Sequence, residues 1–425
     1  MIAFGVIFVL LALLGTPLFA IIAAGAMLSF HLAGIDPTVL AIEVFRLAEM
    51  PVLLAIPLFT FAGYLVSESG APGRLVRLSQ ALLGWMPGGL AVVSLASCAF
   101  FTAFTGASGV TIIALGAVLY PALTEAGYDD KFNLGLITTS GSLGLLFAPS
   151  LPLILYGIVA QQSGTEEMVS IDALFRAGIL PGILMLVLLS MWSLWVNRHN
   201  RSSFKSFSWA KVKAAVRESF WEIPLPIVVL GGIYSGFFAV SEAAAVTALY
   251  VIIVEIFILR EVQLKELPAI MRKSMLLVGG VLIILGVSMA STTAMIDAGV
   301  PSRLFEFVRA HIDSRLTFLI LLNCFLLGLG AILDIFSALV LIVPLILPVA
   351  AGYGVHPAHL GIIFLANMQI GYITPPIGMN LFIASYRFEK PVLTLYRSTL
   401  PFFFILAFSV VIITYWPWLS LWLIQ

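Results

Sequence analysis

Long apolar segments limit the folds open to this chain more than any other feature. They lie near residues 2–33, 51–66, 88–123, 132–160, 177–196, 223–259, 274–296, 316–350, 360–386 and 399–424. A membrane-spanning helix needs about 20 such residues. With 61% hydrophobic and 10% charged residues, the composition is also far from that of a soluble domain. We therefore predict an all-α polytopic membrane protein with about ten or eleven crossings.

Two of these segments cannot form continuous helices. In 360–386, Pro375, Pro376 and Gly378 interrupt the middle of the span. In 132–160, the stretch TTSGSLGLLFAPSLP does the same. The backbone groups freed at such a break must find partners in protein, water or a ligand, so a broken span indicates a buried site.

Two other segments have small or polar residues at their centres. The centre of 88–123 is TGASG, and the centre of 316–350 contains Asp334. We expect each segment to be a re-entrant hairpin, with two ordinary crossings as the alternative. Asp334 is the only charged residue between Arg315 and Arg387. A carboxylate at membrane depth is costly, so Asp334 is a functional candidate, although a helix N-cap would also explain it.

The two halves of the chain share a motif and several anchor residues. The motif reads GAPGRL at 70–75 and GVPSRL at 299–304. The shared anchors are Pro121, Gly135 and Pro149 in one half, and Pro348, Gly361 and Pro375 in the other. We predict a first inverted repeat over 1–196 and a second over 223–425. Between them, the basic stretch 197–222 is expected to be a cytoplasmic connector.

Oxygen atoms dominate the chemistry of the hairpins and breaks. Lys and Arg are absent from all four segments. Hydroxyl and carbonyl oxygens suit sodium, whereas the N-termini of half-helices, aided by Ser and Asn, could bind an anion. The candidate sodium ligands are Thr105, Gly106, Ser108, Ser142, Gly144, Gly330, Asp334, Thr374, Pro375 and Gly378. The candidate substrate residues are Ser108, Ser150, Asn367, Pro376 and Asn380.

Sequence motifs of enzymes are absent from the chain. There is no HExxH, no nucleophile elbow, no P-loop and no dinucleotide fingerprint. The two cysteines have no nearby His or second Cys, which does not indicate a metal centre or a redox pair. We expect no cofactor, no nucleic-acid partner and no catalysis, and sodium as the coupling ion. A lipid-modifying enzyme using Asp334, or a structural membrane scaffold, are the alternatives outside transport.

The chain resembles the large membrane subunit of tripartite ATP-independent periplasmic (TRAP) transporters. The resemblance extends over nearly the whole length. It is carried by GAVLYPALTEAGY, APSLPLILYG, SIDALFRAGILPGILM, PLILP and GYITPPIGMNLF. It implies an inverted-repeat elevator fold and sodium-coupled uptake of a small organic acid across a bacterial inner membrane. It also implies two protein partners, a small four-helix membrane subunit and a soluble periplasmic binding protein.

Two positions depart from the pattern of that family. Ala148 stands where the family often has Pro, and Asp334 where it often has Glu. By resemblance, sodium sites are expected where each hairpin tip meets the break of its own half. A stand-alone sodium- or proton-coupled dicarboxylate carrier is the alternative within transport. The substrate, the sodium stoichiometry and the oligomeric state do not follow from the sequence.

Overall fold

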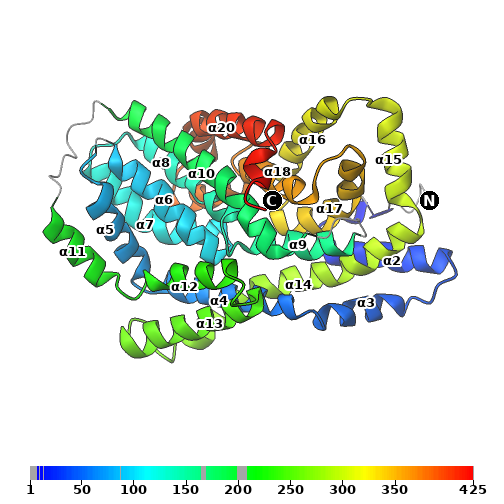
Figure 1. Cartoon of the computed structure of the whole chain (residues 1–425), viewed down its shortest axis with the longest axis horizontal. Coiled ribbons are helices and arrows are strands. Elements are labelled where there is room, and N and C mark those ends of the chain that lie inside the picture. Colours follow the sequence, from blue (N-terminus) through cyan, green and yellow to red (C-terminus); the bar gives the residue numbers. More distant parts are fainter. Residues whose placement is uncertain are drawn as a thin grey trace.

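The computed structural model describes residues 7–424 except 9, 13, 87, 164–168 and 199–207. Within these residues the chain is helical and contains no strand. Part of the predicted connector 197–222, including Arg201 and Lys205, therefore lies outside the described residues. Figure 1 shows a bundle that is longer than it is wide, with α11 near one end and α2 and α15 near the other.

The first half contains helices that follow the predicted order of arm, hairpin and broken span. The arm is α5 (Ala71–Leu83), the hairpin is α6 (Gly89–Thr105) and α7 (Ser108–Glu125), and the broken span is α8 (Asp130–Ser140), η2 (Leu143–Leu146) and α9 (Leu151–Gln162). The other helices of this half are α2 (Leu18–Leu32), α3 (Val39–Ala48), η1 (Pro51–Leu54), α4 (Ala55–Glu68) and α10 (Ile171–Val196). α11 (Trp209–Glu218) lies within the predicted connector.

The second half repeats this order. Its arm is α15 (Val300–His311), its hairpin is α16 (Arg315–Gly330) and α17 (Ile335–Gly352), and its broken span is α18 (Pro357–Gly371) and α19 (Met379–Phe388). The remaining elements are α12 (Pro224–Tyr234), α13 (Val240–Ile252), η3 (Ile253–Ile258), α14 (Leu267–Asp297), α20 (Val392–Tyr415) and α21 (Trp418–Leu421). The predicted all-α fold with two hairpins and two broken spans is confirmed.

Fewer helices can cross a membrane alone than the apolar segments suggest. By length and composition, seven described helices qualify, or up to nine if each bent pair is one span. We expected ten or eleven crossings. The difference arises because several apolar segments are divided into shorter helices, such as α2, α6 and α12. At the second arm, α15 and α16 meet at an angle of 116°.

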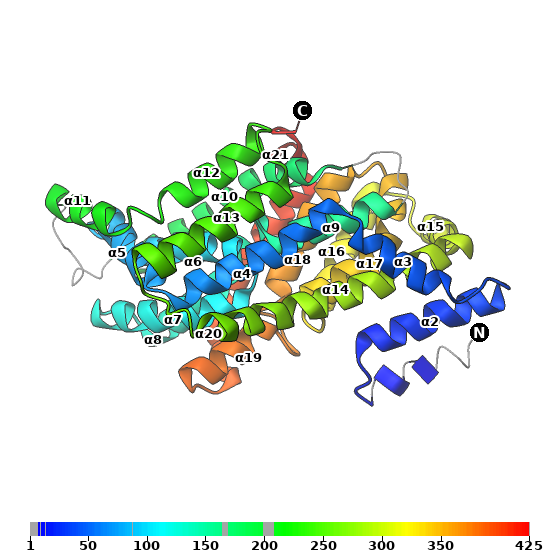
Figure 2. The same ribbon diagram turned by 90° about the horizontal axis from the view of Figure 1, so that it is seen from below.

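The broken spans pack reciprocally across the two halves. α20 of the second half lies along α8, and α10 of the first half lies along α18. Likewise α9 packs on α17, and α19 packs on α7. Every residue of α18 is buried, and this helix lies near the centre of the bundle (Figures 1 and 2). Each break is thereby held by helices of the other half. The repeat boundaries at 196 and 223 stay a prediction.

Candidate functional site

The tip of the first hairpin is a two-residue turn. Gly106 ends α6 with a φ of +64°, in the left-handed region that glycine adopts without steric cost. A Cβ at Gly106 would lie 2.7 Å from Cβ of Leu151. Since Leu151 begins α9, the tip lies directly against the second half of the broken span. Ser108 begins α7 and is buried.

The first break packs closely on the hairpin. A Cβ at Gly144 would lie 2.2 Å from the carbonyl oxygen of Ala99 and 2.4 Å from the backbone nitrogen of Ala103, both in α6. Thr102 Oγ1 lies 2.9 Å from the carbonyl oxygen of Gly141 and 2.7 Å from Oγ1 of Thr111. Thr102 therefore joins tip and break, although it is not among the sequence candidates.

Hydroxyl groups occupy the inside of the first break. Ser150 Oγ donates a hydrogen bond to the carbonyl oxygen of Leu145 (2.6 Å), and Ser142 Oγ donates to that of Thr139 (3.3 Å). Both serines are fully buried. Thr105, in contrast, lies against α4, where a Cβ at Gly63 would be 2.6 Å from its Cα. Thr105 lines a pocket between α4, α6 and α13, and its Oγ1 lies 3.5 Å from the carbonyl oxygen of Ala107 at the tip.

Asp334 caps a helix at the tip of the second hairpin. Its Oδ1 accepts hydrogen bonds from the backbone N–H groups of Phe336 and Ser337, both at 3.0 Å, and its Oδ2 accepts one from Ser337 Oγ at 2.5 Å. The N-cap alternative is therefore correct as a description of the local structure. The carboxylate remains half-buried, so capping does not exclude a second role.

The second tip and the second break are joined through their backbones. A Cβ at Gly371 would lie 2.4 Å from the carbonyl carbon of Gly330. The N–H groups of Ile377 and Gly378 both donate to the carbonyl oxygen of Ala331, at 3.2 and 3.1 Å. Gly378 has a φ of +60°. The sequence candidates Gly330 and Gly378 thus lie at one junction, and Asp334 lies three residues after Ala331 at the same tip.

Part of the second break faces outward. Pro375, Pro376 and Ile377 are exposed. Tyr396 Oη donates to the carbonyl oxygen of Pro376 at 2.8 Å, and Thr374 Oγ1 donates to that of Ile370 at 2.8 Å. The peptide bonds Ala148–Pro149 and Pro375–Pro376, one in each break, are cis.

The two broken spans meet at Asn380. Asn380, near the start of α19, donates through Nδ2 to the carbonyl oxygen of Thr138 in α8 at 3.2 Å. Asn380 Oδ1 and Thr139 Oγ1 are buried and have no hydrogen-bond partner within the described part of the chain. Buried polar atoms are normally hydrogen-bonded, so an unpaired one indicates a place for a ligand or a water molecule.

Two amides of α18 occupy different environments. Asn367 Nδ2 donates to Asn323 Oδ1 at 2.6 Å, so it faces α16 and a groove between α16, α18 and α20 instead of the break. Gln369 is fully buried, and neither end of its amide has a partner among the residues that the structure describes. Gln369 was not a sequence candidate, although an amide inside an apolar segment was a usable signal.

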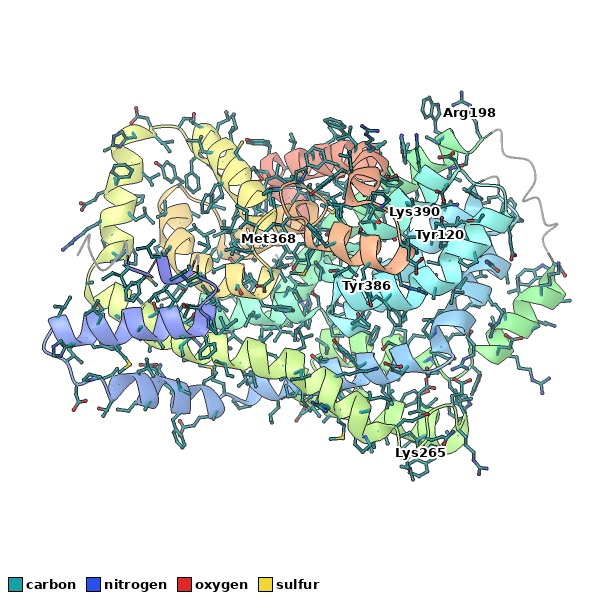
Figure 3. All side chains as sticks on the ribbon, turned by 180° about the vertical axis from the view of Figure 1, so that it is seen from behind. Tyr120, Arg198, Lys265, Met368, Tyr386 and Lys390 are labelled. Carbon is teal, nitrogen blue, oxygen red and sulfur yellow. The ribbon has the colours of Figure 1, made fainter. Side chains whose placement is uncertain are left out.

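Asp130, the first residue of α8, connects α8 to α7 and to the segment after α19. It accepts a hydrogen bond from Tyr120 of α7, and its carboxylate lies 3.3 Å from Nζ of Lys390, just after α19. Tyr120 and Lys390 lie close together in Figure 3, beside the exposed Tyr386. The cross-half contact thus extends from Asn380 to the surface.

The tips and breaks offer groups that bind ions and polar ligands, although these segments contain no Lys or Arg. Four helices, α7, α9, α17 and α19, begin at the tips and breaks, and helix N-termini carry partial positive charge. Hydroxyl and carbonyl oxygens are the other available groups. Within the described residues, no cluster of three or more His, Cys, Asp or Glu could hold a metal ion.

Comparisons with known proteins identify the family. The profile described as "Tripartite ATP-independent periplasmic transporter, DctM component" matches residues 4–419. The chain is 33% identical over 383 residues to the C4-dicarboxylate TRAP transporter large permease protein DctM of Pseudomonas aeruginosa, which covers 90% of this chain and 88% of that protein. It is 31% identical over 420 residues to the ectoine/5-hydroxyectoine TRAP transporter large permease protein UehC of Ruegeria pomeroyi, covering 98% and 96%.

A solved structure shares the fold at low sequence identity. The YdaH transporter of Alcanivorax borkumensis superposes with a TM-score of 0.62 and 15% identity, over 89% of this chain and 87% of that chain. The family profile and both relatives are described as transporter components and not as enzymes. This chain belongs to the family of DctM components, the large permeases of tripartite ATP-independent periplasmic transporters.

Proposed function

We propose that this chain is the large permease of a sodium-coupled transporter that takes up a small organic acid across a bacterial inner membrane. The observation that carries the proposal is the meeting of two tip-and-break junctions through Asn380 and Thr138. Both junctions lack Lys and Arg. The name of the Pseudomonas relative, which specifies C4-dicarboxylates, supports an acid as substrate.

Two sodium sites are proposed, one at each junction. At the first, Ser108, Ser142 and Gly144 lie where α6, α7 and η2 meet, and the buried Thr102 joins this set. At the second, the candidates are Gly330, Asp334, Thr374, Pro375 and Gly378. Backbone carbonyls of unwound segments together with hydroxyls form the usual sodium environment in broken-helix transporters.

The substrate is proposed to bind between the junctions. Asn380 offers a buried amide oxygen without a described partner and Ser150 a buried hydroxyl, and the N-terminus of α19 supplies N–H groups for a carboxylate. Pro376 contributes its exposed backbone. Asn367 faces the groove beside α16, so it is a weaker candidate.

The partners follow from the tripartite family. We propose that a small four-helix membrane subunit and a soluble periplasmic binding protein complete the transporter, and that the two hairpins move in an elevator fashion. Membership of a tripartite family does not favour the stand-alone carrier. A ligand drives such movement only through different affinities for the two states.

Uptake of a radiolabelled C4-dicarboxylate into vesicles carrying all three components tests this function. With an inward sodium gradient, Asn380→Ala and Thr374→Ala should each lower the initial rate at least about tenfold, since loss of about 1.4 kcal/mol of binding corresponds to tenfold. Thr124→Ala is the matched control, because it removes the same kind of hydroxyl-to-carbonyl bond at the far end of α7. Uptake that does not require sodium would overturn the coupling, and wild-type rates in both variants would overturn the site.

A further inference from the structure

A buried arginine fastens the first arm to the rest of the bundle. Arg74 of α5 donates through Nε to Glu222 Oε1 at 2.5 Å and through a terminal nitrogen to Glu261. Its other terminal nitrogen lies 3.7 Å from Glu255 Oε2. Glu222 lies in the turn between α11 and α12, Glu255 in η3, and Glu261 in the segment between η3 and α14. These four residues are termed the Arg74 cluster.

The cluster has more acidic than basic groups. If all are ionised, three negative charges face one positive charge. The side chains of Arg74, Glu222 and Glu255 are 8%, 7% and 3% exposed, and that of Glu261 is 31% exposed. Burying unpaired charge is costly, and a protein usually neutralises such a group.

Neighbouring charges do not cancel the excess. On α5, Arg77 is paired with Glu218 of α11 at 2.9 Å, and both are exposed. Glu68 of α4 is paired with Lys273 of α14 at 2.6 Å, also at the surface. From α13, Tyr250 faces the pocket and donates to the carbonyl oxygen of Trp221 at 2.7 Å. Arg77 also acts on Glu261, whose pKa its charge helps to lower. Arg260, next to Glu261 in the chain, is exposed, so water screens its charge and it does not neutralise the buried Glu222 and Glu255.

Three atoms of the cluster lack hydrogen-bond partners. In the described residues, Glu222 Oε2, Glu255 Oε2 and one terminal nitrogen of Arg74 are buried and unpaired. Glu261 is different, because it accepts from both Arg74 and the backbone N–H of Gly70. Burial acts to raise the pKa of Glu261, but these hydrogen bonds and the charge of Arg74 outweigh it and lower that pKa. Glu261 is therefore the carboxylate that stays ionised.

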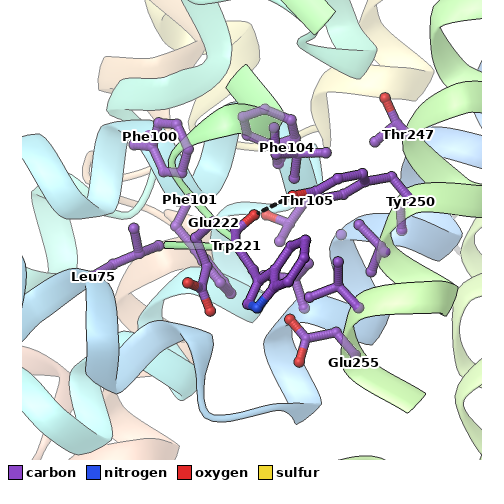
Figure 4. A pocket seen from close by; sticks show the side chains of 16 residues that line it. Leu75, Phe100, Phe101, Phe104, Thr105, Trp221, Glu222, Thr247, Tyr250 and Glu255 are labelled. Atoms are coloured by element: carbon purple, nitrogen blue, oxygen red, sulfur yellow. Dashed lines mark hydrogen bonds between the residues drawn. The ribbon is translucent and has the colours of Figure 1, made fainter. Parts of the chain in front are cut away.

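A largely apolar pocket adjoins the two under-bonded carboxylates. It lies between α4, α5, α6, α12 and α13, and its wall includes Phe101, Phe104 and Trp221 together with Glu222 and Glu255. Figure 4 shows both carboxyl groups beside the indole of Trp221. An apolar wall offers water no route to solvate a second negative charge, so a neutral carboxyl group is favoured there.

We propose that the Arg74 cluster is a proton-binding site, in which Glu222 and Glu255 together carry one proton taken from water. The bound proton leaves one excess negative charge instead of two and converts an unpaired acceptor oxygen into a donor. The protonated cluster then holds α5 on the α12–α13 segment, and loss of the proton weakens this contact. The proposal does not depend on sodium coupling or on any substrate.

Infrared spectroscopy of the purified chain in detergent tests the proposal directly. The wild type should show the carbonyl-stretch band of one protonated carboxyl group near pH 7, and this band should disappear as the pH rises to about 9. In Glu255→Gln and in Glu222→Gln the cluster already has one negative charge fewer, so the band should be missing between about pH 7 and about pH 9. Glu218→Gln, which alters the exposed pair with Arg77, should keep it.

Thermal unfolding provides a second measurement. The wild type should lose stability as the pH rises from the ordinary glutamate pKa of about 4.3 towards about pH 9, because only the folded cluster holds its proton over this range. Glu255→Gln, which mimics the protonated side chain, should not show this loss. If one glutamine variant does not fold, the infrared band is measured in the other. An unchanged band in both glutamine variants, or a wild type without such a band, would overturn the proposal.

Discussion

The two halves of the permease share the order of their elements but differ in how tightly they are closed. In the first half, Arg74 of the arm is buried among three carboxylates, and the break around Ser142 and Ser150 is inaccessible. In the second half, α15 has no buried residue, the matching Arg303 is exposed, and Pro375 to Ile377 lie at the surface. Repetition in sequence thus sets topology, whereas burial depends on partners elsewhere in the chain.

The largest expected effect is the loss of stability when a glycine at each junction is replaced by alanine, which adds one methyl group. Gly144→Ala should cost about 3 kcal/mol, because the new Cβ would meet backbone atoms of α6 in a closed site. Gly371→Ala meets backbone of Gly330 just as closely, but the more open second junction can shift, so about 1–2 kcal/mol is expected. The measurement is the thermal unfolding midpoint of the purified chain in detergent.

A glycine with free space provides the control. Gly279 lies inside α14, and a Cβ there would meet nothing within 4 Å. Gly279→Ala should be neutral or stabilise by up to about 1 kcal/mol, since glycine weakens a helix interior. If Gly371→Ala proves as destabilising as Gly144→Ala, the second junction is as rigid as the first and the contrast is wrong.

An intermediate effect is expected at Asp334, where two substitutions distinguish helix capping from sodium binding. Asp334→Ala removes the side chain that accepts from Phe336 and Ser337 and should cost about 1–2 kcal/mol. Asp334→Asn keeps a capping oxygen and should preserve stability to within about 0.5 kcal/mol. Both should abolish sodium-dependent uptake if the carboxylate binds the ion. Normal uptake by the Asn variant would restrict Asp334 to capping.

The sequence predicted the parts of the fold that depend on local pattern. Pro375, Pro376 and Gly378 predicted where the second span breaks, and the Thr-Gly-Ala-Ser turn predicted the first tip, because proline and glycine act on the backbone wherever they occur. The shared motifs predicted that the halves correspond. These inferences needed no knowledge of distant contacts.

Side-chain directions could not be predicted in the same way. Thr102 and Thr105 are three positions apart on α6, yet Thr102 contacts the break and Thr105 faces α4. Asn367 likewise donates to Asn323, whereas the amide of Gln369 has no partner among the described residues. Which side of an all-apolar helix meets which partner depends on packing with helices far along the chain. The Arg74 cluster was missed for this reason, since its acids lie about 150 to 190 residues from Arg74.

The smallest expected effect compares the two arms through pH. Since the pKa of Glu261 is lowered by Arg74 and Gly70 in the folded chain, its stabilising effect is present above its ordinary pKa and is lost as the pH falls through the folded value. Glu261→Gln should therefore lower stability near pH 7, by less than about 1 kcal/mol because the side chain is partly exposed, and should match the wild type in strong acid. Glu306→Gln on the exposed second arm should change nothing at either pH. Equal losses in both variants would mean that the first arm is no more firmly held than the second.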